Sequence, residues 1–277
     1  MRALYILAVA ACLAATLGCN DPTAVYDRNR NAILRSHSHL VNGDKALARD
    51  AYDRAGDLYG KAGGALAQAI TELSSAERDV GQQLRDLERQ GAPQTGNVGG
   101  TRFYADTLRG YREILASAIV LRAVAIERQG EAAYRGGARD VLNGDANYRA
   151  RQFATAHRQF GDADGQFGHA ILSFTETLDY LKQAAAEANR LSRAAPPGTW
   201  SILEPLRQNV TYRLAQAGAY RSAAAQRTLQ AAHVVSLYRR QNVGNIPEVD
   251  IVPLIPLPEV VRSGATPPPV PNVNLGK

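Results

Sequence analysis

Two stretches of equal length decide the fold. Residues 42–76 read NGDKALARDAYDRAGDLYGKAGGALAQAITELSSA, and residues 143–177 read NGDANYRARQFATAHRQFGDADGQFGHAILSFTET. The two stretches align without a gap at an offset of 101 residues, and sustained self-similarity of this kind predicts an internal duplication. The matched pairs include Tyr52 with Phe153, Ala55 with Ala156, Tyr59 with Phe160, Gly60 with Gly161, and Ala62 with Ala163.

Large apolar residues recur every seven positions in both copies. Small residues, mostly alanine, stand three positions after most of them, so each copy carries a narrow seam that is typical of long helices packed in coiled-coil fashion. An aromatic stripe at this spacing is ordinarily core, and we interpret it as such rather than as a ligand groove. The large positions are Tyr52, Tyr59, Leu66, Leu73, Val80 and Leu87 in the first copy, and Phe153, Phe160, Phe167, Phe174 and Leu181 in the second.

Helix breakers divide this pattern into five helices, which predicts an all-α, elongated bundle of long antiparallel helices. The Asn-Gly-Asp triplets at 42–44 and 143–145 are expected turns. A glycine-rich loop at 91–100 and the Pro-Pro-Gly at 196–198 supply the other breaks. The expected helices span about 24–41, 45–90, 101–142, 145–194, and from 199 or 201 to 241 or 244.

Residues around these breaks supply the expected helix starts. Asp21-Pro22-Thr23 introduces the first helix, Thr101 can cap the third, and Thr199 or Ser201 can cap the fifth. Glycines inside the spans, at 63–64, 136–137 and 165, either kink the helices or permit close helix crossing.

The N-terminus has the form of a signal peptide. Arg2 precedes an apolar run at 3–17 that is too short for a permanent membrane span. The chain has two cysteines, Cys12 and Cys19, so cleavage after Gly18 would leave Cys19 as the first residue with no partner for a disulfide.

Thr16-Leu17-Gly18-Cys19 resembles the lipobox of bacterial lipoproteins. The resemblance implies that Cys19 carries diacylglycerol and anchors the chain, with palmitate as a typical acyl group, and Asn20 in place of Asp favours the outer membrane. The triplet before Cys12, Val9-Ala10-Ala11, matches the lipobox more closely but follows a shorter apolar run. Ordinary cleavage near Gly18, which would give a soluble periplasmic or secreted product, is the remaining alternative.

The net charge of the chain is compatible with a role in the cell envelope and does not indicate binding to nucleic acid. Without residues 1–18 the chain keeps 31 basic against 26 acidic residues, a net charge of +5. This balance suits anionic lipid or acidic wall polymers, and the expected compartment argues against nucleic acid. The arginines are spread along the helices, as on a solvated face.

Proline separates the C-terminal tail, residues 245–277, from the helices. Proline at this density prevents helix and central strand and favours polyproline-II or disordered chain. Two interpretations stay open: a solvated tail, or a strap that packs on the bundle or binds a partner through Val252, Leu254, Ile255 and Leu257.

No residue pattern indicates catalysis, a cofactor or a metal. His37 and His39 lie about 200° apart around a helix, so they cannot share one metal ion. His157, His169 and His233 lack the neighbouring ligands of a metal motif, and Asp162 with Asp164 is more typical of a solvated face than of an acid and base pair. Phosphate loops, nucleophile elbows and zinc signatures are not found in the sequence.

The segment Gly43-Asp44, Ala48, Tyr52 and Ala55 resembles the second helix of a tetratricopeptide repeat, although the heptads continue past the next expected turn. The expected organisation is a signal peptide (1–18), a tether (19–23), two helical units (24–142 and 143–244) and the tail. We therefore expect a non-enzymatic lipoprotein that anchors a helical scaffold for envelope proteins, acting through its tail or a helical groove. The alternative is a soluble periplasmic helical-repeat module that binds protein partners.

Overall fold

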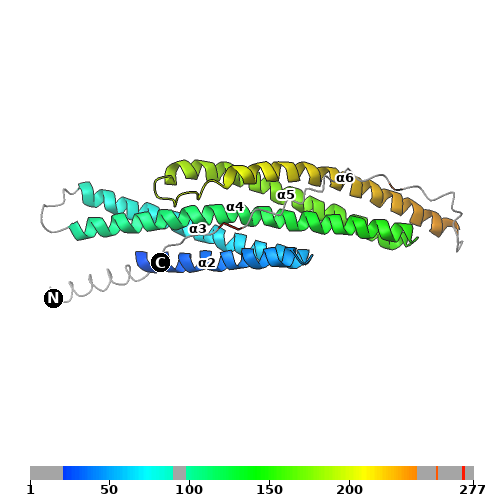
Figure 1. Ribbon diagram of the computed structural model, residues 1–277, viewed down its shortest axis with the longest axis horizontal. Coiled ribbons are helices and arrows are strands. Elements are labelled where there is room, and N and C mark those ends of the chain that lie inside the picture. Colours follow the sequence, from blue (N-terminus) through cyan, green and yellow to red (C-terminus); the bar gives the residue numbers. More distant parts are fainter. Residues whose placement is uncertain (1–20, 90–97, 242–253, 255–269, 272–277) are drawn as a thin grey trace, which may run out of the picture.

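The computed structural model describes residues 21–89, 98–241, 254, 270 and 271, and these include five α-helices (Figure 1). Successive helices run antiparallel in an elongated bundle, so the predicted fold class is confirmed. The longest helix has 52 residues and is about 78 Å long at 1.5 Å per residue. The helices are α2 (Pro22–Leu47), α3 (Tyr52–Arg89), α4 (Val98–Arg149), α5 (Phe153–Leu191) and α6 (Leu203–Gln241).

Helix α4 belongs to two groups of three helices. Each helix packs mainly on its neighbour in the chain, and α4 also contacts α2 and α6. At the offset of 101 residues, α2 of the first copy corresponds to the C-terminal half of α4, and α3 corresponds to α5. The expected division between residues 142 and 143 therefore falls inside a helix, because the C-terminal half of α4 acts as the first helix of the second group.

The predicted heptad seams form the core. Tyr59, Leu66 and Leu73 on α3 are fully buried, as are Phe160, Phe167 and Phe174 on α5. The alanines between them are buried as well, which lets α3 and α5 approach their neighbours closely. At the ends of the α3 seam, Tyr52 and Leu87 are only partly buried.

Both Asn-Gly-Asp triplets lie inside helices, so the prediction of turns at these positions was wrong. α2 continues to Leu47 and α4 to Arg149. A Cβ atom added to Gly43 would lie 2.4 Å from the Tyr59 ring, and one added to Gly144 would lie 2.5 Å from the Phe160 ring. The glycines are therefore required for the close approach of an aromatic ring from the next helix, and not for a change of chain direction.

The chain turns a few residues later, in the same way in both copies. Asp50 has φ 57° and Arg151 has φ 61°, again 101 residues apart. The amide of Ala51 donates to the carbonyl of Ala46 (3.0 Å), and that of Gln152 donates to that of Asn147 (2.8 Å). These bonds are typical of a helix end that closes on a left-handed residue.

Other helix ends agree with the sequence only in part. Asp21 caps α2, as predicted, since its side chain accepts from the Thr23 amide at 2.9 Å. Thr101 lies inside α4, and Thr199 and Ser201 precede α6 without capping it, because their hydroxyls donate back to the carbonyls of Pro196 and Gly198. Helices α3, α4 and α5 run through their internal glycines without a break.

Two apolar residues of the tail pack on the bundle. Leu254 lies against a cluster formed by the C-terminal parts of α4 and α6 and the start of α5, which includes Tyr148, Phe153 and Val234. Val270 packs against the main core. At these two positions the tail is a packing strap; Val252, Ile255 and Leu257 lie outside the described residues.

Replacing Gly43 or Gly144 by alanine should lower the free energy of unfolding by about 1–3 kcal/mol, because the added methyl group overlaps an aromatic ring in a packed core. Urea denaturation measures this change. Gly161→Ala is the matched control on α5: a Cβ there meets no atom within 4 Å, so helix propensity should raise stability by up to about 1 kcal/mol. Equal effects at Gly144 and Gly161 would contradict the packing role.

Candidate functional site

Cys19, the predicted lipidation site, and Cys12 lie outside the described residues, which begin at Asp21. Lipidation therefore stays a prediction. The structure does describe the segment that would join such an anchor to the bundle. α2 begins at Pro22, so only residues 20 and 21 separate Cys19 from the helix.

The first turn of α2 is bound to α4. The Tyr111 hydroxyl donates to the Pro22 carbonyl at 2.6 Å, and the ring centroids of Tyr26 and Tyr111 lie 6.3 Å apart. A Cβ at Gly110 would lie 3.3 Å from the Tyr26 ring, so this glycine lets the ring approach α4. Burial, with a smaller effect of Asp21, raises the pKa of Tyr111 to about 12. The start of α2 is thus held in a fixed position on the bundle.

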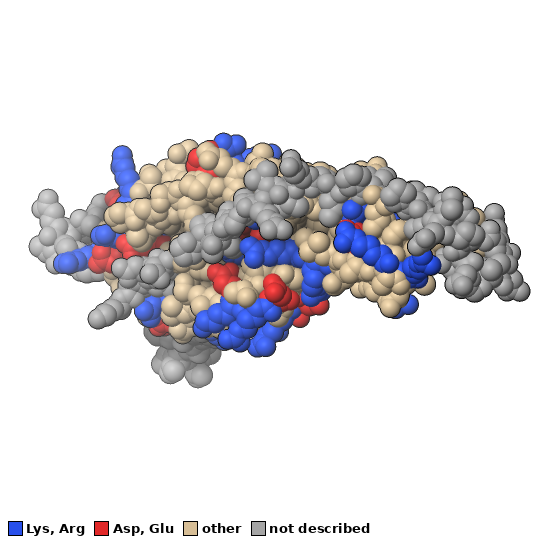
Figure 2. Space-filling model, turned by 45° about the vertical axis from the view of Figure 1, so that its right-hand side comes forward, with Lys and Arg blue, Asp and Glu red and all other residues tan. Residues whose placement is uncertain are grey.

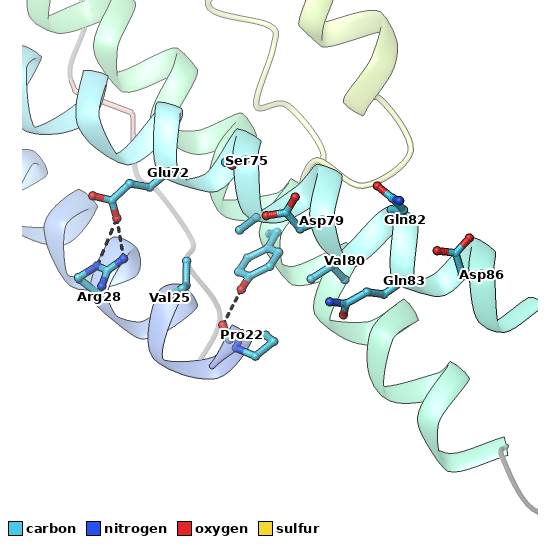
Figure 3. Close-up of a pocket in the computed structure, with 12 residues that line it drawn as sticks. Pro22, Val25, Arg28, Glu72, Ser75, Asp79, Val80, Gln82, Gln83 and Asp86 are labelled. Atoms are coloured by element: carbon cyan, nitrogen blue, oxygen red, sulfur yellow. Dashed lines mark hydrogen bonds and ion pairs between the residues drawn. The ribbon is translucent and has the colours of Figure 1, made fainter. Parts of the chain in front are cut away.

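A groove of about 520 Å³ opens beside this first turn (Figure 3). Figure 3 shows Pro22, Val25 and Arg28 on one side of it and the side chains of α3 on the other. Its lining combines a few apolar residues with polar and charged ones. The lining residues are Pro22, Val25, Arg28, Glu72, Ser75, Ala76, Asp79, Val80, Gln82, Gln83, Asp86 and Tyr111.

Glu72 is already occupied by partners within the chain. Arg28 Nη2 donates to its carboxylate at 2.9 Å and Asn29 Nδ2 at 3.2 Å. Hydrogen bonds from Gln68, and then from Arg28 and Asn29, outweigh the effect of partial burial and lower the pKa of Glu72. Asp79 and Asp86 add two further carboxylates on the α3 wall. The groove therefore presents acidic and amide groups, which suit a polar or cationic segment of a partner.

A second groove, of about 530 Å³, crosses α3, α4 and α5. Small residues of α3 and α4 line it, among them Gly56, Gly60, Ala132 and Ala133. Its polar residues are Asp53, Asp57, Lys61, Gln129, Gln166, His169 and Ser173, with Tyr52 at one end. This groove lies between the duplicated helices α3 and α5.

A cluster of buried charges lies where α4 meets α2 and α6. Glu127 and Arg128 are each 1% exposed, and Glu131 is 2% exposed. Arg128 Nε lies 3.3 Å from Asp44 of α2, and Arg213 Nε of α6 lies 3.2 Å from Glu131. The cluster therefore links both groups of three helices through charges of α4 that are shielded from water.

Glu127 has few partners for a buried carboxylate. Its carboxylate accepts one hydrogen bond from Asn209 at 3.1 Å and lies 3.5 Å from Arg128 Nη1. Burial raises the pKa of Glu127 to about 7; Arg128 opposes the shift and Glu131 adds to it. Glu127 therefore titrates near neutral pH.

Sequence reasoning missed this cluster, because its members are far apart along the chain. One signal was present: Glu127, Arg128 and Glu131 follow directly after a largely apolar run at 114–126. Charges that share the buried helix with such a run must find partners on neighbouring helices. Which helices supply those partners depends on the packing.

The histidines and acids considered as chemical groups do not come together. Asp164 pairs with Arg221 at 3.1 Å, whereas Asp162 is exposed. In the described part of the chain, no group of three or more His, Cys, Asp or Glu residues is placed to hold a metal ion. None of the helices α2 to α6 has the length and apolar character needed to cross a bilayer. On the face shown in Figure 2, Lys and Arg lie in several groups with Asp and Glu nearby.

Glu127→Gln should stabilise the protein relative to wild type above pH 7, and this gain should be much smaller below pH 5. The raised pKa means that the folded state keeps a proton which the unfolded state loses near pH 4.5, so wild-type stability falls between about pH 4.5 and pH 7. Glutamine removes this dependence, with an expected gain of about 1–3 kcal/mol at pH 8. Thermal unfolding at pH 5 and pH 8 measures it.

Glu176→Gln is the matched control, because Glu176 is exposed on α5. Its effect should stay within about 0.5 kcal/mol at both pH values. If Glu127→Gln destabilises the protein equally at pH 5 and pH 8, the carboxylate is ionised throughout and the interpretation fails.

Comparison with known protein families, with characterised proteins and with solved structures gives no match to this chain. Its function is therefore to be inferred from its own residues and from the arrangement of its helices.

Proposed function

We propose that this protein is a non-enzymatic lipoprotein of a bacterial envelope, in which Cys19 anchors a helical scaffold that holds other envelope components. The scaffold binds partners through surfaces along the bundle and has no reaction centre. Asn20 favours the outer membrane over the inner one, and the bundle then faces the periplasm.

The short connection between Cys19 and α2 is the observation that supports this proposal most. Residues 20 and 21 can span about 7 Å when extended. The first turn of α2 is bound to α4 by the Tyr111 hydroxyl. A lipid on Cys19 would therefore hold one part of the rigid bundle next to the membrane, instead of leaving it on a long flexible tether.

The groove beside this first turn then lies close to the membrane surface. Its Asp79 and Asp86 side chains and its amide groups would contact a segment of a partner that is itself at the membrane. Binding at a site that is preformed and close to the anchor requires little ordering of the chain.

A soluble periplasmic binding module is the second candidate. The groove across α3, α4 and α5 supports it, because this groove lies between the duplicated helices and is lined by small residues that admit a peptide or helix. In that case the signal peptide is removed without lipidation, and the protein stays in the periplasmic fluid.

Cys19→Ser should move the protein from the membrane fraction to the soluble periplasmic fraction, because the acceptor of the lipid is lost. Fractionation followed by intact-mass measurement tests this. The wild-type mass should correspond to a chain that begins at Cys19 with added acyl groups.

Cys12→Ser is the matched control, and it should leave both fractionation and mass of the mature chain unchanged. A wild-type chain that is soluble and carries no acyl mass would refute the anchor and support the binding module. If Cys12→Ser abolishes anchoring and Cys19→Ser does not, the lipidation site is Cys12.

A further inference from the structure

A shallow hollow of about 500 Å³ lies where the end of α3, the start of α4 and the turn after α5 meet. Three arginines and four apolar residues line it, and among the described residues the lining includes no carboxylate. The lining residues are Leu84, Ala105, Leu108, Arg109, Arg112, Arg193 and Ala194. The hollow thus combines positive charge with apolar surface.

Positive charge is in excess around the hollow. Arg112 and Arg190 both bind the single carboxylate of Glu77, at 2.8 and 2.6 Å. Burial would raise the pKa of Glu77, but the hydrogen bonds from Arg190 and Arg112 outweigh it and lower the pKa, so this carboxylate is ionised. Arg190 also pairs with Glu187 at 2.8 Å, so two carboxylates balance these two arginines and the excess positive charge lies on Arg193.

The other two arginines of the lining reach into solvent. Arg109 pairs with Glu113 at 3.1 Å, but three quarters of its side chain is exposed. Arg193 is exposed, and the described residues supply it with no hydrogen bond or ion pair. Arg193 is thus available to an external anion.

Apolar groups lie next to these charges. Leu108 is 8% exposed and forms part of the core, whereas Leu84 is partly buried.

We propose that this hollow binds the phosphate group of an anionic phospholipid, with the apolar lining in contact with the glycerol and upper acyl region. Guanidinium groups match the geometry of phosphate oxygens, and the apolar half of the hollow distinguishes a lipid from a free anion. The α3–α4 end of the bundle extends past the start of α2, so the hollow and the expected anchor lie toward the same end (Figure 1).

This site goes beyond the proposed anchor and does not depend on it. A chain that begins at residue 19 with Cys19→Ser should still bind vesicles of phosphatidylglycerol and phosphatidylcholine, reversibly and too weakly to keep the variant in the membrane fraction of cells, and should bind vesicles of phosphatidylcholine alone much more weakly. Vesicle sedimentation measures the affinity. If the wild type is lipidated in cells but the Cys19→Ser chain does not bind anionic vesicles, the lipid site alone is refuted. If the Cys19→Ser chain binds anionic vesicles but the wild type is not lipidated, the anchor alone is refuted.

Arg193→Gln and Arg109→Gln should each weaken binding to the anionic vesicles roughly fivefold, the contribution expected for one arginine near a charged bilayer. Arg158→Gln is the matched control: Arg158 is exposed near the start of α5, and its loss changes the net charge equally. Binding should fall less than twofold with Arg158→Gln. Circular dichroism checks that all variants keep their helices.

Two results would overturn the proposal. Equal weakening by Arg193→Gln and Arg158→Gln would mean that binding depends on net charge and not on the hollow. If inorganic phosphate binds as tightly as dihexanoyl phosphatidylglycerol and Arg193→Gln weakens both equally, the ligand of the hollow is a free anion and not a lipid. The expected result is binding of the short-chain lipid with no measurable binding of phosphate at the same concentration.

Discussion

The packing of an aromatic ring onto a glycine of the preceding helix is the contact on which the bundle depends. Tyr59 covers Gly43 and Phe160 covers Gly144, at distances that admit no side chain on the glycine. The aspartate after each glycine then binds an arginine of the third helix: Asp44 pairs with Arg128, and Asp145 pairs with Arg227. Ring and ion pair together set the relative positions of three helices in each copy.

The two copies satisfy this contact by different chemistry. The Tyr59 hydroxyl donates to Asp44 at 2.7 Å, so ring and carboxylate are joined directly. Phe160 has no hydroxyl, and the guanidinium of Arg227 lies over its ring, 5.8 Å from the centroid, while it pairs with Asp145. Removing one partner of such a buried pair leaves an uncompensated charge, so each pair favours a single register of the helices.

Sharing of α4 explains why the molecule is one continuous bundle. Its N-terminal half completes the first group, and its C-terminal half begins the second. The charges Glu127, Arg128 and Glu131 lie at the start of the C-terminal half and bind partners on α2 and α6. Helix α2 starts near the α3–α4 end, and the first groove and the arginine hollow lie toward that end as well. The surfaces proposed to contact membrane and partners are therefore carried by a rigid framework.

Local sequence determined the helical class, the heptad seams and the duplication, because burial of a helix face requires apolar residues at a fixed spacing whatever lies opposite. The sequence also predicted Asp21 as the cap of α2, because its hydrogen bond joins residues only two positions apart. Tertiary structure alone decided the role of Gly43 and Gly144: glycine serves turns and close packing alike, and only the Tyr59 and Phe160 rings distinguish the two. The arginine hollow likewise joins residues 84, 109 and 193, whose proximity follows from helix packing and from no pattern along the chain.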